Sequence, residues 1–379
     1  MTPRAAVVVV DACGVGALPD AADYGDEGTN TLAHVAEAVG GLRLPTLERL
    51  GLGSILPLRG VEPAAEPAAL HGRLAAQGVG KDSTAGHWEL MGVVCESAPA
   101  TYPDGFPPEM IETIAGAAGR GVIGGEPSEG IAVLERHGAR HLQTGELILY
   151  TSQDSVLQLA AHVDVMPAEE LYAACERVRA ITDMGRVIAR PFSGQPGAFQ
   201  RTGGRRDFAL PPPTRSYLDE LADAGVATHG VGKVPDLFAG RGLDAAHYAP
   251  GNAEAIGVTT ELLGVLEGGL IFTNLVETDQ VYGHRKDVKG FHRALQEIDA
   301  AVAHWLSLLR DGDLLIVTAD HGCDPASPHT DHTREHVPLL AMGGRVPSRR
   351  HDGALADVGA TVHRWLTGRD ANLPGAPFA

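Results

Sequence analysis

The sequence contains few cysteines and no long apolar segment. Its four cysteines, among 379 residues, include no Cys-x-x-Cys pair. Scattered cysteines in so large a chain are typical of a reduced protein rather than of a disulfide framework. The longest apolar runs are about as long as residues 5–10, which is too short for a transmembrane helix or for the apolar stretch of a signal peptide. We therefore expect a cytoplasmic protein without a membrane partner.

Basic residues are also scarce. The chain has 30 lysines and arginines against 48 acidic residues, which gives a formal net charge of −18. Nucleic acids and anionic membranes both require a basic surface, so neither is an expected partner. Small anionic molecules stay compatible with this charge if cations gather locally. The acidic excess would also suit divalent metals, although solubility alone explains most of it.

Short apolar runs alternate with helical patterns along the chain. This alternation predicts an α/β fold with a largely parallel central sheet. The expected strands are residues 5–10, 146–151, 187–189, 270–276, 314–318 and 337–341. The expected helices are residues 29–39, 167–182, 214–224 and 290–309.

Two proline-rich stretches interrupt this pattern, at residues 97–108 and 211–213. Proline fixes the backbone and breaks helices, so both stretches are candidate linkers, although ordinary loops would also explain them. The segment between them is long enough for an inserted domain. The expected organisation is a discontinuous core, residues 1–96 and 213–379, with an inserted α/β domain at residues 97–212.

Aspartate and histidine residues follow several of the predicted strands. Because the carboxyl ends of parallel strands meet at one edge of a sheet, we expect these side chains to converge. Helix capping explains any single one of them about as well, but it does not explain the whole set. Aspartate and histidine without cysteine suit Mn²⁺, Zn²⁺ or Mg²⁺. The candidate ligands are Asp11, Asp279, His284, Asp320, His321 and His332.

Residues 80–89 have the pattern of a turn that enters a helix, with two adjacent hydroxyl groups, Ser83 and Thr84. A hydroxyl at a helix N-terminus lies where the backbone N–H groups and the helix dipole favour a phosphate. Metal coordination would make such a hydroxyl a nucleophile. Helix capping by Ser or Thr is the structural alternative, and the metal ligands elsewhere in the chain favour the catalytic interpretation.

Taken together, these motifs resemble the phosphopentomutases of the alkaline phosphatase superfamily over nearly the whole chain. The last two of the matching segments are especially specific. The segments are Asp11 with Gly14-Val15-Gly16, Pro19-Asp20-Ala21, Gly80-Lys81-Asp82, Gly86-His87-Trp88-Glu89, Tyr282-Gly283-His284-Arg285, Thr318-Ala319-Asp320-His321-Gly322 and Thr330-Asp331-His332-Thr333-Arg334-Glu335.

The resemblance implies an alkaline-phosphatase-like core interrupted by a cap domain, and two metal sites, usually occupied by Mn²⁺. One site would use Asp11, Asp320, His321 and the nucleophile, and the other Asp279, His284 and His332. The implied reaction interconverts ribose (or 2-deoxyribose) 1-phosphate and 5-phosphate through a phosphoenzyme and a pentose 1,5-bisphosphate, and a sugar bisphosphate would prime it. Alignment favours Ser83 as the phosphorylated residue, with Thr84 as its rival. The implied substrate contacts are Asp154, Arg186, Arg201 and Lys233.

The chain departs from the family pattern at three places. Ser83 stands where the family usually has Thr, Glu277-Thr278-Asp279 replaces the common Asp-Phe-Asp, and residues 127–131 differ from the usual cap segment. The main alternative function is a metal-dependent phosphatase or phosphodiesterase on the same core, which would release free phosphate. A sulfatase is not indicated, because the sequence has no Cys-x-Pro-x-Arg or Ser-x-Pro-x-Arg motif. A metal-stabilised binding protein would not need the full set of ligands.

Overall fold

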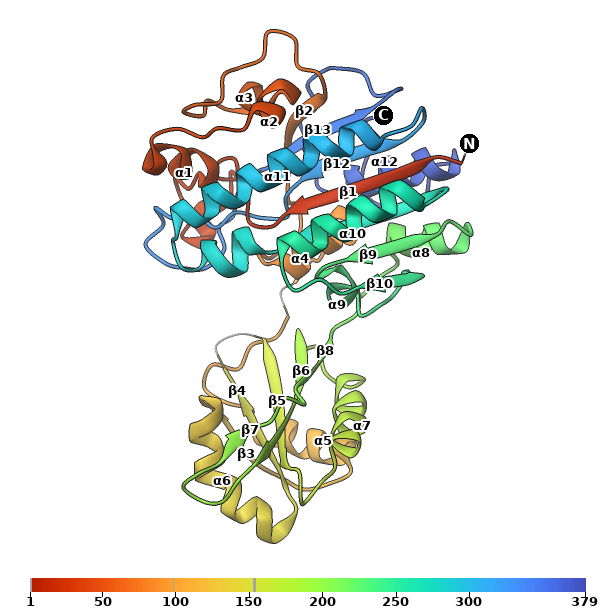
Figure 1. The fold of residues 1–379 in the computed structure, drawn as a ribbon. Helices are drawn as coiled ribbons and strands as arrows, with labels where there is room; N and C mark the ends of the chain where they lie inside the picture. The colour runs from red at the N-terminus through yellow and green to blue at the C-terminus, as the bar shows by residue number, and fades with distance from the viewer. Residues whose placement is uncertain (1, 98, 153–154) are drawn as a thin grey trace. The chain divides into compact units, whose positions relative to one another are not determined.

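The computed structural model describes residues 2–97, 99–152 and 155–379 and contains two compact units. The core unit comprises Met1–Ser97 and Pro212–Ala379, and the inserted unit comprises Ala98–Pro211. Each unit has its own sheet with helices packed against it (Figure 1). Asp154, an expected sugar contact, lies outside the described residues.

The core unit is built on an eight-stranded sheet with the order β10-β9-β11-β1-β12-β13-β2-β14. All neighbouring strands are parallel except for the two pairs that involve β13. The largely parallel sheet expected from the sequence is therefore confirmed. Its strands are β1 (Arg4–Val10), β2 (Leu70–Ala75), β9 (Thr228–Val231), β10 (Ala245–His247), β11 (Gly269–Leu275), β12 (Leu314–Thr318), β13 (Val337–Gly343) and β14 (Gly353–Ala354).

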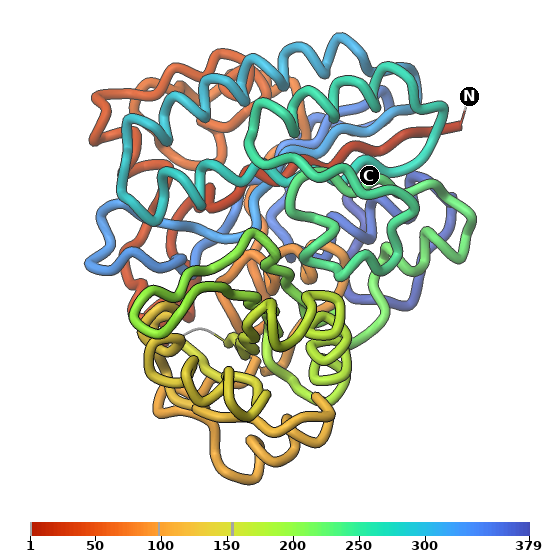
Figure 2. Tube along the Cα trace, turned by 60° about the horizontal axis from the view of Figure 1, so that its bottom comes forward, coloured from red at the N-terminus to blue at the C-terminus, as the bar shows by residue number. Residues whose placement is uncertain are grey.

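Helices cover both faces of this sheet. Helices α10 and α11 lie side by side over one face (Figures 1 and 2), whereas α12, which packs on α8 and α4, contacts β1 and β11 from the other. No helix in the described part of the chain is long and apolar enough to cross a membrane. The helices are α1 (Thr31–Val39), α2 (Pro45–Leu50), α3 (Leu52–Ile55), α4 (Ser83–Leu90), α8 (Tyr217–Asp223), α9 (Val234–Leu237), α10 (Asn252–Val265), α11 (Val288–Leu308) and α12 (Asp357–Thr367), with a 3₁₀ turn η1 (Ala21–Tyr24) and a π-helical turn η2 (Thr278–Gly283).

The central strands follow from their predominantly apolar sequences. All seven residues of β1 and all seven of β11 are buried, as expected for parallel strands with helices on both faces. The expected helices 29–39 and 214–224 begin two and three residues later than predicted, because Asn30 and Ser216 cap them. Each capping side chain accepts a backbone N–H of the first turn, so the capping residue itself stays outside the helix.

The inserted unit has a mixed six-stranded sheet with the order β3-β4-β5-β6-β7, and β8 also pairs with β6. The expected strand 187–189 is longer than predicted, because β6 keeps pairing with β5 and then with β7 as far as Ser193. The elements are α5 (Pro108–Ala118), β3 (Val122–Pro127), α6 (Gly130–Thr144), β4 (Leu147–Thr151), β5 (Val156–His162), α7 (Ala168–Arg179), β6 (Arg186–Ser193), β7 (Gln200–Arg201) and β8 (Arg206–Ala209).

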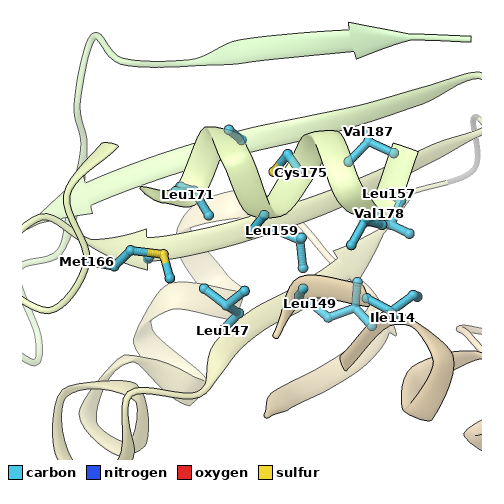
Figure 3. Packing of buried hydrophobic residues seen from close by; sticks show 14 of the residues in the cluster. Ile114, Leu147, Leu149, Leu157, Leu159, Met166, Leu171, Cys175, Val178 and Val187 are labelled. Carbon is cyan, nitrogen blue, oxygen red and sulfur yellow. The ribbon is translucent and has the colours of Figure 1, made fainter. Parts of the chain in front are cut away.

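The two faces of this smaller sheet carry separate hydrophobic clusters. Leu147 and Leu149 of β4 pack with Leu171 and Val178 of α7 and with Ile114 of α5 (Figure 3). The intervening residues of β4 point to the opposite face, because side chains alternate along a strand. There they join a second cluster with residues of α6. Both faces are thus covered, and the unit has a core of its own.

Candidate metal centre and nucleophile

The carboxyl ends of three adjacent strands bring together the candidate ligands. In the sheet, β1 lies between β11 and β12. Asp11 directly follows β1, Asp279 lies in the π-helical turn after β11, and Asp320 follows β12. All three carboxylates are at least 97 % buried. The fold therefore concentrates three acidic side chains, distant in sequence, at one sheet edge.

Asp11, Asp320 and His321 form the first cluster, with one ligand atom from each within 4.8 Å of the others. His321 Nε2 lies 3.4 Å from Asp11 Oδ1 and 3.5 Å from Asp320 Oδ2. The other ring nitrogen, Nδ1, is 3.0 Å from the Gly322 carbonyl oxygen. A proton on Nδ1 satisfies that carbonyl and leaves the Nε2 lone pair directed at the two carboxylates, the orientation that a metal ligand requires.

The two carboxylates of this cluster have opposite pKa shifts. Burial and the negative charge of Asp320 raise the pKa of Asp11 well above its ordinary value. Burial would also raise the pKa of Asp320, but its interactions with His321 and His87 lower it on balance. Two buried carboxylates at this spacing repel each other unless a cation lies close by.

The second cluster is centred on Asp279 Oδ1. His332 Nε2 lies 3.3 Å from this oxygen and His284 Nε2 lies 3.4 Å from it. His284 Nδ1 is 2.7 Å from the Thr330 carbonyl oxygen, which again leaves Nε2 free to face the carboxylate. Burial would raise the pKa of Asp279, but contact with His332 and the charges of the neighbouring histidines lower it. Two sets of three residues each have one ligand atom per residue within 4.8 Å of the others. One set is Asp279, His321 and His332, and the other is Asp279, His284 and Cys323.

Unpaired polar atoms show that the site fits a divalent metal. Asp279 Oδ1, Asp320 Oδ2 and His332 Nε2 are buried and make no hydrogen bond of good geometry among the described residues, although His332 Nε2 lies 3.3 Å from Asp279 Oδ1 and His87 Nδ1 lies 3.0 Å from Asp320 Oδ2. Buried polar atoms are almost always satisfied in proteins, so three such atoms at one place point to a missing ligand. The donor set of carboxylate oxygens and imidazole nitrogens suits Mn²⁺, Zn²⁺ or Mg²⁺.

Ser83 lies beside the first cluster. Its Oγ is 3.2 Å from His321 Nε2 and 3.4 Å from Asp11 Oδ1, and it accepts a hydrogen bond from Lys233 Nζ at 3.3 Å. The capping alternative for the two hydroxyls is wrong, because Asp82 caps α4 by accepting the backbone N–H groups of Thr84 and Ala85. The Ser83 hydroxyl is therefore available for chemistry.

Two further polar residues support this arrangement and were not assigned a role from the sequence. His87 Nδ1 is 2.9 Å from the carbonyl oxygen of Ser83 and 3.0 Å from Asp320 Oδ2. Asn274 Nδ2 donates to Asp11 Oδ2 at 2.9 Å and lies 3.2 Å from His87 Nε2. The signal that could have identified Asn274 is a polar amide inside the otherwise apolar strand β11.

Asp26 ties the loop of the nucleophile to the loop of the second cluster. Its buried carboxylate accepts hydrogen bonds from Lys81 Nζ at 3.0 Å and from the Arg334 backbone N–H at 2.8 Å. His329 Nε2 lies 2.9 Å from its other oxygen. Lys81 is two residues from Ser83 and Arg334 is two residues from His332, so this one carboxylate holds both loops.

The expected substrate cations fall into two groups. Lys233 belongs to the core unit and contacts Ser83. Arg186 and Arg201 belong to the inserted unit, where Arg186 lies 3.8 Å from Asp207. The buried Tyr150 has a raised pKa because of burial, and the nearby charges of Arg190, Arg201 and Arg205 partly oppose this shift. Burial and the neighbouring arginine charges lower the pKa of Arg190, and such crowding of guanidinium groups is typical of an anion site.

Comparisons with known proteins agree with this geometry. The model of the metalloenzyme superfamily matches residues 3–367. A phosphopentomutase of Syntrophotalea carbinolica is 53 % identical over 366 residues, which cover 95 % of this chain and 93 % of the relative. A phosphopentomutase of Anaeromyxobacter sp. (strain K) is 48 % identical over 375 residues, 97 % of this chain and 96 % of the relative. A solved phosphoglycerate mutase of Leishmania mexicana has a similar fold, with a TM-score of 0.52 at 14 % identity over 100 % of this chain and 97 % of that one.

Proposed function

The chain belongs to the phosphopentomutase family of the metalloenzyme superfamily, and we propose that its reaction passes through a phosphoester on Ser83. The protein is an isomerase that interconverts the 1-phosphate and 5-phosphate of ribose or 2-deoxyribose. The single observation that supports the phosphoester is the position of Ser83 Oγ. It lies within 3.4 Å of two candidate metal ligands, Asp11 after β1 and His321 after β12. A hydroxyl at this position, at the start of α4, can both receive and donate a phosphoryl group.

Transfer would occur in two steps. The free hydroxyl of the pentose phosphate attacks the phosphorus on Ser83, its O–P bond forms as the Oγ–P bond breaks, and the hydroxyl proton passes to a base. The product is a pentose 1,5-bisphosphate, which reorients. Its other phosphorus then bonds to Ser83 Oγ as the P–O bond to the sugar breaks, and the freed sugar oxygen takes the proton back from the base. Lys233 Nζ, at 3.3 Å from Oγ, would neutralise charge on the phosphoryl group in both directions.

The proposed metal cofactor is a pair of divalent cations, with Mn²⁺ as the family suggests. When bound, they supply charge neutralisation and activation of the attacking and leaving oxygens. Asp11, Asp320 and His321 would hold one, together with Ser83, and Asp279, His284 and His332 would hold the other. His87 and Asn274 would keep the carboxylates of the first set in place through the contacts described above.

We propose that the inserted unit acts as a cap that binds the sugar phosphate and excludes water. Exclusion of water separates a mutase from a phosphatase, because water would hydrolyse the phosphoenzyme. Arg201, together with Arg190 and Arg205, is the candidate site for the distal phosphate, and Arg186 and Asp154 stay proposals from the family resemblance. The four cysteines are free, which fits a reducing compartment such as the cytoplasm.

The deciding experiment is conversion of ribose 5-phosphate to ribose 1-phosphate by the purified protein, with Mn²⁺ and a sugar bisphosphate primer. Formation of ribose 1-phosphate without release of inorganic phosphate is the expected result. Stoichiometric release of phosphate would instead favour the phosphatase alternative. Metal analysis of the same sample should give two divalent ions per chain.

A further inference from the structure

Cys323 lies against the second cluster. One atom each of Asp279, His284 and Cys323 come within 4.8 Å of one another. The Cys323 side chain is buried, with the residue only 1 % exposed. Its Sγ–H donates to the Asp331 carbonyl oxygen at 3.8 Å, a long and weak contact.

The surrounding backbone holds this sulfur in place. The Cys323 N–H donates to Thr31 Oγ1 at 3.0 Å. A Cβ atom added at Gly283 would lie 3.1 Å from Cys323 Sγ, so the sulfur packs directly on the residue that precedes His284. The position of the sulfur is therefore fixed next to a candidate ligand.

Two independent features show that this position faces a ligand site. Asp279 Oδ1 is buried and makes no hydrogen bond of good geometry among the described residues. His284 Nδ1 donates to the Thr330 carbonyl oxygen. This leaves a free lone pair on His284 Nε2, which lies 3.4 Å from Asp279 Oδ1. The carboxylate, the imidazole and the thiol thus come within 4.8 Å of one another, each with a lone pair available to a metal.

We infer that Cys323 is an additional ligand of the second metal site and that it shifts this site towards thiophilic divalent ions such as Zn²⁺ and Co²⁺. The inference rests on the two-metal centre proposed above. On binding, the metal replaces the thiol proton, which passes to water. Thiolate favours Zn²⁺ and Co²⁺ over Mn²⁺, which prefers oxygen and nitrogen donors. The first cluster contains only oxygen and nitrogen donors, so the two sites would differ in metal preference.

The test uses Co²⁺ as the probe on the full-length protein. After removal of bound metal, two equivalents of Co²⁺ should give a sulfur-to-cobalt charge-transfer band in the near ultraviolet. Cys323→Ser should lose this band while still binding Co²⁺. In this variant the affinity of the second site for Zn²⁺ relative to Mn²⁺ should fall by roughly 10- to 100-fold or more. Loss of a residue that only supports a metal ligand already costs a metal site about this much.

Cys13→Ser is the matched control. Cys13 is also buried, but it belongs to none of the ligand clusters found among the described residues, so the band should survive this change. Cys323→Ala provides a second variant if the serine variant fails to fold, as judged by circular dichroism. Two bound Co²⁺ ions without the band, or a band that persists in both Cys323 variants, would overturn the role of Cys323 and leave the metal centre standing. Failure of the wild-type chain to bind Co²⁺ would overturn both.

Discussion

Strands β1 and β12 lie side by side, and buried charged side chains stand at both ends of this pair, arranged in opposite ways. At the amino end, Arg4 Nε donates to Asp313 Oδ2 at 3.0 Å, and both residues are buried. At the carboxyl end, Asp11 and Asp320 face each other with His321 between them. The same two strands thus carry a complete ion pair at one end and a pair of like charges at the other.

The pKa shifts of the two ends differ accordingly. Burial would raise the pKa of Asp313, but the hydrogen bonds and charge of Arg4 lower it on balance. The pKa of Asp11 is raised by burial and by the charge of Asp320. The amino end is therefore a closed ion pair, whereas at the carboxyl end the charged form of Asp11 stays unfavourable until a cation binds.

The largest effect is expected from Ser83→Ala. Loss of the nucleophile should lower mutase activity by on the order of 10⁴- to 10⁶-fold, as nucleophile removal does elsewhere, with little change in stability. Thr84→Ala is the control and should keep activity. Mass spectrometry of the peptide spanning residues 81–89, after incubation with a sugar bisphosphate, should place the phosphate on Ser83. Phosphate on Thr84 would show that the assignment is wrong by one residue.

Asp320→Asn should separate function from stability at the carboxyl end. Loss of one metal should cost on the order of 10³-fold or more in activity. The metal-free variant should be somewhat less stable than the metal-free wild type, because the lowered pKa of Asp320 means that the fold favours its charged form through His321 and His87. Metal analysis and urea unfolding in the presence of a chelator measure both. His284→Ala should remove the other metal, and near-normal activity with one metal missing would contradict the two-metal centre.

Asp313→Ala should have the opposite profile at the amino end. It leaves Arg4 buried without its partner, which costs about 3 to 5 kcal/mol of unfolding free energy. The folded variant should still bind two metals per chain. A double variant, Arg4→Met with Asp313→Leu, should be less destabilised than the single one, because it leaves no unpaired charge. If both variants were equally destabilised, lost packing rather than the unpaired charge of Arg4 would account for the loss of stability.

The smallest effect is the pH dependence of the metal-free protein. A raised pKa means that folded Asp11 holds its proton at a pH where the unfolded chain has lost it. Its contribution to stability is therefore present below about pH 4, the ordinary range of an aspartate, and is lost as the pH rises through the folded pKa. In chelator, Asp11→Asn should make the unfolding free energy depend less steeply on pH above 4. An unchanged slope would show that Asp11 does not titrate in this range.

The sequence predicted the parallel sheet because its central strands are continuous apolar runs of ordinary strand length. Residues 314–318 were predicted to the residue. The short strands β10 and β14 were not predicted, because two or three residues carry no periodic signal and depend on pairing with neighbours. Helix starts were predicted too early where polar residues before the helix, including the capping residue, could not be told apart from the first helical turn.

Candidate ligands could be named from sequence because each one follows a strand end. Their supporting residues could not be given roles in the same way. An amide inside a mostly apolar strand marks Asn274 as unusual, but its role and that of His87 depend on a contact between β11 and α4 that the sequence does not reveal. Cys323 was missed for a similar reason. Its neighbour in space is the turn before His284, about forty residues earlier in the chain.

The placement of β1 at the centre of the core sheet has a consequence for synthesis on the ribosome. Both of its partners, β11 and β12, are encoded more than 250 residues later. At about 5–20 residues per second, a strand that is apolar from Ala5 to Val10 must wait on the order of 10 to 50 s before either partner emerges. The inserted unit is contiguous and can fold during that interval. We therefore expect nascent chains that end before residue 269 to bind chaperones through residues 4–10, and chains that extend past residue 318 to be released.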